Sequence, residues 1–205
     1  MIDNLTIITL NQPGITDFAK ARNQAMAKVA TDWVLFIDSD ETVSPQLEAE
    51  IAIAVKNKRF NYQLRRQDFF EGKKLKFGET AAVRLIRLIQ PGSGKWQGQV
   101  HEVFVSKLRV KTLNQPLLHE RRITFGQLFD RLNYYSDLKA KELFDQGVKF
   151  SLWELLFLPW LKLLHNYILR LGVLDGVPGL MLATLMSWHS LMVRVKLYGL
   201  RQKVK

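Results

Sequence analysis

Residues 32–41 read Asp-Trp-Val-Leu-Phe-Ile-Asp-Ser-Asp-Glu, and this stretch decides the fold. The apolar run Trp33–Ile37 has no polar interruption, which is typical of a strand buried on both faces of a parallel sheet. The run stops at Asp38, where the first acidic side chain follows. Ser44 and Pro45 then predict the start of a helix, with serine as the N-cap and proline at the first helical position.

On both sides of this strand, the pattern alternates between strand and helix. Residues 5–10 form a short β-branched run that ends in an Asn-Gln-Pro-Gly turn. Residues 18–29 and 47–55 each place their apolar side chains on one helical face. This order predicts an α/β fold. Residues 60–120 contain short apolar runs between Gly- and Lys-rich turns, which we interpret as hairpins or edge strands.

From residue 121 onward the sequence predicts helices. Thr124 with Gln127, and Ser151 with Glu154, have the spacing of capping boxes at helix starts. We therefore predict two regions, an α/β domain over 1–120 and a helical region over 121–205. Residues 177–193 are uncharged, but they fall short of the roughly 20 apolar residues that a spanning helix needs. An interfacial helix pair is the favoured interpretation, and a buried soluble hairpin is the alternative.

Composition narrows the function classes. The 205 residues include no cysteine, so a disulfide scaffold is excluded, and 47% are hydrophobic, which excludes disorder as the main state. With 30 Lys+Arg against 19 Asp+Glu, the formal charge is +11, which implies anionic partners. Much of the excess lies in the apolar C-terminal region. This combination favours an anionic membrane surface over nucleic acid, and predicts a location at the cytoplasmic face of the cell membrane.

The acidic stretch after the strand is the candidate for chemistry. Ligands of open α/β sheets bind at the carboxyl ends of strands, and Asp38 and Asp40 there could hold a divalent cation, Mn²⁺ or Mg²⁺, that neutralises a diphosphate. Acidic residues at this place also cap helices, so the spacing alone leaves both interpretations open. The string VLFIDSDET also matches a haloacid-dehalogenase phosphatase, in which Asp38 would be the nucleophile, but the paired aspartates of that family are absent downstream.

The neighbouring motifs resemble inverting family 2 glycosyltransferases with a GT-A fold, in particular the bacterial branch that extends lipopolysaccharide core or similar envelope glycans. The resemblance covers nearly the whole chain. It rests on five segments in order, namely residues 21–25 (ARNQA), 32–41 (DWVLFIDSDE), 83–87 (VRLIR), 96–102 (WQGQVHE) and 166–176 (NYILRLGVLDG).

The resemblance implies a role for each matching residue. Asp38 and Asp40 would bind the metal and the nucleotide diphosphate, with His119 as a further metal ligand. Glu102 would be the catalytic base that takes a proton from the acceptor hydroxyl. The remaining roles are donor binding, by Arg22, Asn23, Asp38, Arg84 and Arg87, and acceptor binding, by Trp96 and His101.

The resemblance also implies the reaction and its partners. A sugar would move, with inversion, from a nucleotide-diphosphate donor to a cell-envelope glycan or lipid-linked acceptor. Members of the family begin with further strands that bind the nucleobase, and the segment around residues 5–23 corresponds to material that follows those strands. A non-catalytic, membrane-peripheral remnant of such an enzyme is therefore the alternative function.

Overall fold

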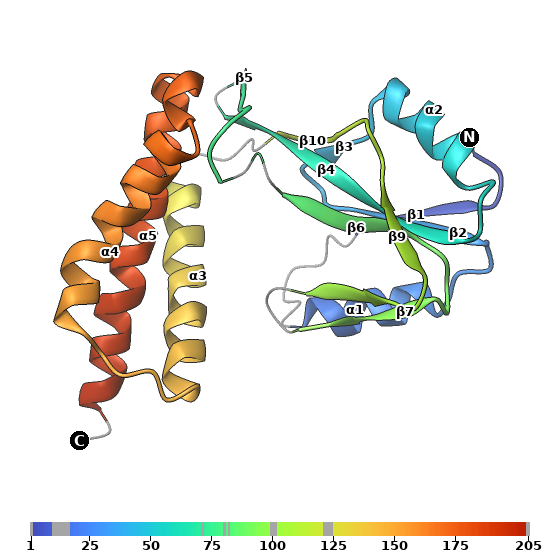
Figure 1. The fold of residues 1–205 in the computed structure, drawn as a ribbon. Coiled ribbons are helices and arrows are strands. Elements are labelled where there is room, and N and C mark those ends of the chain that lie inside the picture. The colour runs from blue at the N-terminus through green and yellow to red at the C-terminus, as the bar shows by residue number, and fades with distance from the viewer. Residues whose placement is uncertain are drawn as a thin grey trace. The chain divides into compact units, whose positions relative to one another are not determined.

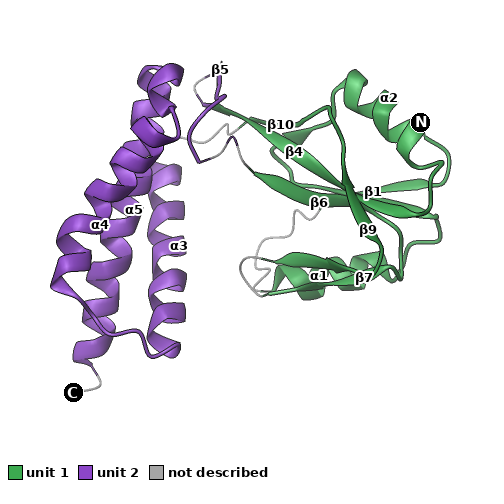
Figure 2. Ribbon diagram, in the orientation of Figure 1, with its two compact units in different colours: residues 1–69, 82–120 green, residues 70–81, 121–205 purple. Residues whose placement is uncertain are grey.

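The computed structural model describes residues 2–9, 17–70, 72–79, 81, 83–98, 102–120 and 125–203 (Figure 1). The chain divides into two compact units (Figure 2). Unit 1 comprises residues 1–69 and 82–120, and unit 2 comprises residues 70–81 and 121–205. Residues 70–81 belong to the helical unit although they lie far from it in sequence, a placement that the sequence patterns did not indicate.

Unit 1 is a mixed sheet with helices, as the α/β prediction requires. Its strands follow the spatial order β1-β2-β6-β4-β10-β3, and β9 also pairs with β4. The β1–β2 pair is parallel, whereas β6 runs antiparallel to both β2 and β4. The strand bounds are β1 Leu5–Thr9, β2 Trp33–Ile37, β3 Glu41–Thr42, β4 Phe60–Phe70, β6 Arg84–Ile89, β9 Arg109–Thr112 and β10 Leu117–Glu120.

Strand β2 separates two apolar cores, because its side chains alternate between the faces of the sheet. Trp33 and Leu35 pack into one core, with Leu47 and Ile51 of helix α2 (Pro45–Ala54). Val34 and Phe36 pack into the other core, with helix α1 (Phe18–Met26) and strands β7 (Gly94–Gln97) and β8 (Val103–Ser106). Figure 1 shows α2 on one side of the sheet, and α1 with β7 on the other.

Several local predictions are confirmed in unit 1. All of Trp33, Val34, Leu35 and Phe36 are buried, as expected for a strand covered on both faces. The Ser44 side chain accepts a hydrogen bond from the Leu47 backbone N–H, and Pro45 opens α2. The hairpin interpretation of residues 60–120 is correct for β7–β8, which pair antiparallel. It is wrong for β4, an 11-residue strand inside the sheet that pairs with β6 and with β10.

The described part of unit 2 contains three long helices and a turn region. Helix α3 (Phe125–Asp145) is followed by α4 (Leu152–Leu164), a π-helical turn η2 (His165–Leu169), a 3₁₀ turn η3 (Gly172–Asp175) and α5 (Val177–Gln202). Ser151 caps α4 as predicted, by accepting from the Glu154 backbone N–H. The predicted Thr124 cap lies outside the described residues. None of the described helices combines the length and hydropathy that crossing a membrane requires.

Candidate functional site

Asp38 lies at the carboxyl end of β2, where two arginines bind its carboxylate. Oδ1 accepts from Arg22 Nη2 at 2.8 Å, and Oδ2 accepts from Arg87 Nη2 at 2.5 Å. Burial alone would raise the pKa of the Asp38 carboxyl, but the charges of Arg87 and Arg22 outweigh burial and lower it. The first aspartate of the Asp-Ser-Asp-Glu stretch is therefore held ionised between two cations.

Arg87 reaches this position because of a bulge in β6. Tyr62 of β4 pairs with Leu88, but the next residue, Gln63, pairs with Ile86, so Arg87 has no partner in β4. A bulge of this kind re-aims a side chain and breaks the strict alternation of the strand. The Arg87 guanidinium is thereby aimed at the end of β2, where it contacts Asp38 and, at 3.4 Å, Glu41 Oε1.

Arg22 connects Asp38 to Glu102. The residue is only 2% exposed, and its Nε donates to Glu102 Oε1 at 3.2 Å while Nη2 binds Asp38. Its guanidinium lies 4.9 Å from the centre of the Trp96 ring and 5.2 Å from that of Phe36. Such aromatic contacts stabilise a desolvated cation. The guanidinium therefore holds the predicted base and the predicted donor-binding aspartate at a defined separation.

Asn23, the neighbour of Arg22 on α1, holds strand β7 in place. Its Nδ2 donates to the Trp96 carbonyl oxygen at 2.9 Å, and its Oδ1 accepts from the Trp96 backbone N–H at 3.0 Å. The amide thus pairs with one peptide unit on both sides. The structure gives Asn23 this positioning contact, and its predicted contact with the donor stays a prediction.

The His119 imidazole of β10 contacts two further carboxylates, and together they form a second cluster at the same edge of the sheet. Its Nδ1 bonds to the Asp68 carboxylate, and its Nε2 lies 3.3 Å from Asp40 Oδ2. Burial would lower the pKa of His119, but its bonds to Asp40 and Asp68 raise it instead. The imidazole is fixed between two carboxylates that come from β4 and from the turn after β2.

The Asp40 carboxylate and the His119 imidazole could together hold a divalent cation if a bound substrate supplies the other ligands. A carboxylate that binds one imidazole nitrogen orients the other nitrogen toward a metal, and Asp68 has this relation to His119. Mg²⁺ is usually held by one or two carboxylates together with substrate phosphates, and Asp40 supplies one carboxylate beside His119. Among the described residues no group of three or more acidic or histidine side chains is arranged to hold a metal alone.

Within the described residues, neither Arg84 nor Trp96 contacts the Asp38 carboxylate or His119. Arg84 is exposed at the start of β6 and forms no ion pair with any described residue. Trp96 is only 6% exposed and packs edge-on against Phe36 and Phe104, so its predicted acceptor binding would require the ring to become accessible. His101 lies outside the described residues.

Two residues without a predicted role join the site. Glu41 is buried and accepts from the Asp38 backbone N–H at 2.8 Å, so it shapes the turn that presents Asp38. Burial raises the pKa of Glu41, although Arg87 opposes this. Asp68 lies within strand β4, where aspartate is disfavoured. No local sequence signal singled out Asp68, which meets His119 only through the pairing of β4 with β10.

Comparison with known proteins identifies the relatives of this chain. A protein from Rickettsia typhi, described as an uncharacterized glycosyltransferase, is 27% identical over 143 residues, covering 62% of this chain and 48% of that protein. The chain thus spans about half the length of the curated relative it matches.

The chain also matches a protein family. Residues 2–108 match the family described as Glycosyl transferase family 2. This match agrees with the glycosyltransferase resemblance and not with the haloacid-dehalogenase alternative. The matched residues include β2, α1 and the Arg22–Asp38–Glu102 contacts. Because the match extends over more than half of its residues, the chain belongs to glycosyl transferase family 2.

Proposed function

We propose that this chain is a glycosyltransferase that moves a sugar from a nucleotide-diphosphate donor to a cell-envelope glycan or lipid-linked acceptor, with inversion. The observation that carries the proposal is the Arg22 guanidinium, which binds Asp38 and Glu102 at once. This contact joins a donor-binding carboxylate to a potential base within one rigid group. Family membership supports the reaction class.

Each residue of the site has a task in the proposed reaction. Glu102 accepts the proton of the acceptor hydroxyl while the hydroxyl oxygen attacks the anomeric carbon of the donor sugar. The bond from that carbon to the diphosphate oxygen breaks as the new bond forms, so one displacement inverts the configuration. Arg22 orients Glu102 through the 3.2 Å contact with Nε, so that the carboxylate keeps one position relative to Asp38. Arg87 holds Asp38 from the other side.

A divalent cation, Mn²⁺ or Mg²⁺, fits this site through Asp40 and His119. When bound, it would neutralise the negative charge on the leaving diphosphate. Asp68 would keep the imidazole in the orientation that ligation needs.

The finer assignment concerns the acceptor and the location. We propose that the acceptor belongs to the lipopolysaccharide core or a similar envelope glycan, and that the chain works at the cytoplasmic face of the cell membrane. The resemblance of residues 166–176 to that bacterial branch supports this assignment. In unit 2 both ends of this stretch bind one segment, because Asn166 donates to Glu79 and Asp175 accepts from the Phe77 backbone N–H.

Thermal unfolding with nucleotide diphosphates tests the donor proposal. UDP, GDP, CDP and ADP should be compared, each with and without Mn²⁺. At least one of them should raise the unfolding temperature more with Mn²⁺ than without it. Asp40→Ala should abolish the part of the temperature increase that depends on Mn²⁺. Asp32→Ala is the control, because Asp32 is exposed at the other end of β2, and it should leave that increase intact. No shift with any nucleotide would favour the non-catalytic remnant.

A further inference from the structure

The outer face of helix α4 is apolar without exception. Its seven exposed positions repeat at helical spacing, and each is leucine, phenylalanine or tryptophan, namely Leu152, Trp153, Leu156, Phe157, Trp160, Leu161 and Leu164. The two charged residues of α4 lie off this face, where Glu154 pairs with Arg194 and Lys162 pairs with Glu79. A helix of a water-soluble unit normally shows the opposite arrangement.

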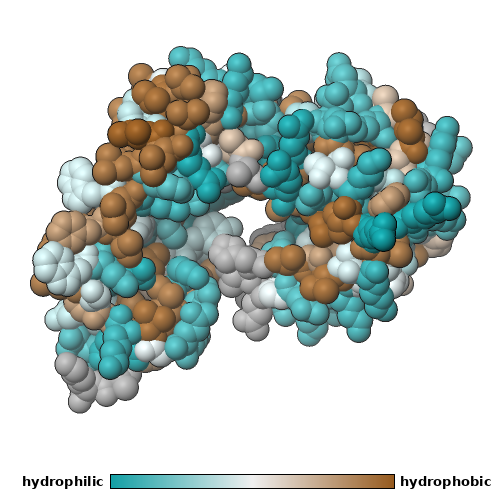
Figure 3. All heavy atoms as spheres, in the orientation of Figure 1, coloured by the Kyte–Doolittle hydropathy of each residue, from teal (hydrophilic) through white to brown (hydrophobic). Residues whose placement is uncertain are grey.

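The apolar surface continues past α4 into the turns and the start of α5. Exposed apolar side chains follow at Ile168, Leu169, Leu171, Val173, Leu174, Val177, Leu180 and Met181. Together with the seven residues of α4 we call this surface the apolar face. In Figure 3 brown, hydrophobic surface gathers over the end of unit 2 that carries η2 and η3.

Helix α3 provides a comparison within the same unit. Most of its exposed positions are polar or charged, among them Asp130, Asn133, Asp137, Lys141 and Asp145. The exposed positions of α3 are therefore mostly polar, whereas those of α4 are all apolar. A large contiguous patch of exposed apolar surface marks an interaction site.

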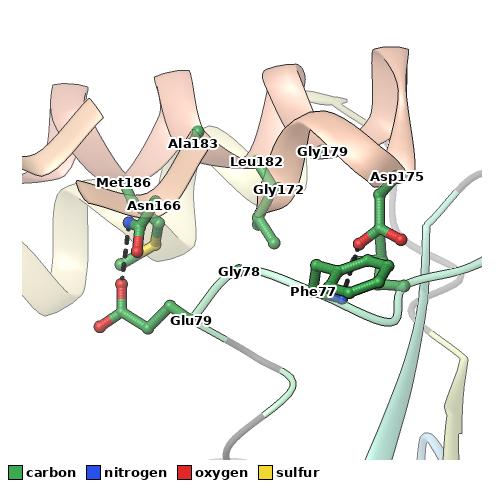
Figure 4. Close-up of a pocket in the computed structure, with 11 residues that line it drawn as sticks. Phe77, Gly78, Glu79, Asn166, Gly172, Asp175, Gly179, Leu182, Ala183 and Met186 are labelled. Atoms are coloured by element: carbon green, nitrogen blue, oxygen red, sulfur yellow. Dashed lines mark hydrogen bonds between the residues drawn. The ribbon is translucent and has the colours of Figure 1, made fainter. Parts of the chain in front are cut away.

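A lysine-rich segment is attached to the η3 end of the apolar face. Asp175 accepts from the backbone N–H of Lys76 at 3.0 Å and from that of Phe77 at 2.9 Å. Figure 4 shows the Asp175 carboxylate beside Phe77. Lys73, Lys74 and Lys76 are exposed, and none of them pairs with a described acidic residue. A residue spans at most about 3.6 Å, so all three lysines lie within about 15 Å of η3.

We propose that the apolar face lies in the interface of an anionic lipid bilayer, with the three lysines on the lipid phosphates. Two exposed tryptophans, Trp153 at 72% and Trp160 at 66%, suit this boundary, because an indole ring is apolar but carries one polar N–H. Helix α4 has 13 residues, a length of about 20 Å, and so lies along the surface rather than across it.

Charge distinguishes the bilayer from a second copy of this chain. Two copies that met through the apolar face would each bring the same lysines to one contact, and the residues of that face include no acidic side chain to pair with them. Anionic headgroups supply that partner, at about a fivefold gain in binding per lysine. Three of the C-terminal basic residues are engaged within unit 2: Arg194 pairs with Glu154, Lys196 pairs with Asp137, and Arg201 donates to the Phe144 and Val148 carbonyl oxygens.

This inference deepens the membrane location within the proposed function, but its test needs neither donor nor acceptor. The full chain should be floated with phosphatidylcholine vesicles, with and without 30% phosphatidylglycerol. It should bind the anionic vesicles at least tenfold more strongly. Failure to bind either vesicle would overturn the proposal and would leave the nucleotide-binding test unaffected.

Matched variants locate the contact. Leu169 and Leu174 are 74% and 62% exposed, and their joint change to glutamate should reduce binding more than tenfold. The control is Ile53→Glu on α2, at a position with 70% exposure, and binding should be unchanged. If the control reduces binding equally, the surface is assigned wrongly.

The lysines need a control with the same change in net charge. Replacing Lys73, Lys74 and Lys76 with serine should reduce binding to anionic vesicles by about two orders of magnitude. The corresponding triple change at exposed lysines of unit 1, Lys28, Lys56 and Lys107, should reduce it much less. Equal losses would show that only net charge matters. A lipid-free dimer that the Leu169→Glu/Leu174→Glu variant dissociates, without vesicle binding, would assign the apolar face to a second copy and overturn the proposal.

Discussion

Replacing Arg22 by methionine should destabilise unit 1 more than any nearby surface change. Methionine keeps the apolar length of the side chain, but it removes the bonds to Asp38 and Glu102 and the contacts with Trp96 and Phe36. Removal of one partner of a buried ion pair costs about 3–5 kcal/mol. Asp38 keeps Arg87 and is partly exposed, so we expect a loss of about 2–4 kcal/mol in the free energy of unfolding.

The measurement must separate unit 1 from unit 2. Hydrogen exchange as a function of urea, followed on peptides from α1 and β2, reports the stability of unit 1 alone. Lys20→Met is the matched control, because it makes the same substitution at an exposed position of α1 and should change stability by less than about 0.5 kcal/mol. A double-mutant cycle with Glu102→Gln should show coupling of at least about 1 kcal/mol. If Arg22→Met costs no more than Lys20→Met, the bridging role of Arg22 is refuted.

Three further predictions follow from contacts elsewhere in the chain. Asp68→Asn should weaken Mn²⁺ binding about 10- to 100-fold in a calorimetric titration with nucleotide present, since it removes the carboxylate that orients His119; unchanged affinity would remove His119 from the metal site. Gly179→Ala should lower the unfolding temperature of unit 2, because its Cβ would lie 2.0 Å from a carbonyl oxygen, whereas Gly199→Ala, in open space on the same helix, should be neutral or stabilising. Lys162 and Asn166 outweigh burial and lower the pKa of Glu79, so its modest contribution to the stability of unit 2 is present above pH 4.5 and is lost as the pH falls through the lowered value. Glu79→Gln should flatten that acid-side decline, and an unchanged decline would contradict this role.

Local elements of this chain could be predicted because the residues that specify them are close in sequence. The apolar run of β2, the Ser44 and Ser151 caps and the acidic turn after Ile37 depend on neighbours within four residues. The grouping of Arg22 with Asp38 was predicted from a family resemblance, and the structure places the two in contact.

Contacts between distant residues could not be obtained in that way. The bulge that aims Arg87 at Asp38 depends on the pairing of β4 with β6, which no local pattern encodes. Asp68 acquires a role only when the parallel pairing of β4 with β10 places it opposite His119. The roles of Arg84 and Trp96 were predicted from their positions in a motif. Whether their side chains are exposed or buried depends on how the whole sheet packs, and a motif does not encode that packing.

The sequence by itself determined that α4 and α5 are apolar helices beside a basic region, since helical periodicity and composition are local properties. Only the tertiary structure decided which side of α4 is left uncovered, and which lysines accompany it. Helical periodicity shows that a stripe is apolar, but it does not show whether another element covers that stripe. In this chain residues far apart in sequence decide both questions, because Asp175 binds the segment around Lys76 and the charged residues of α4 are paired away from its apolar face.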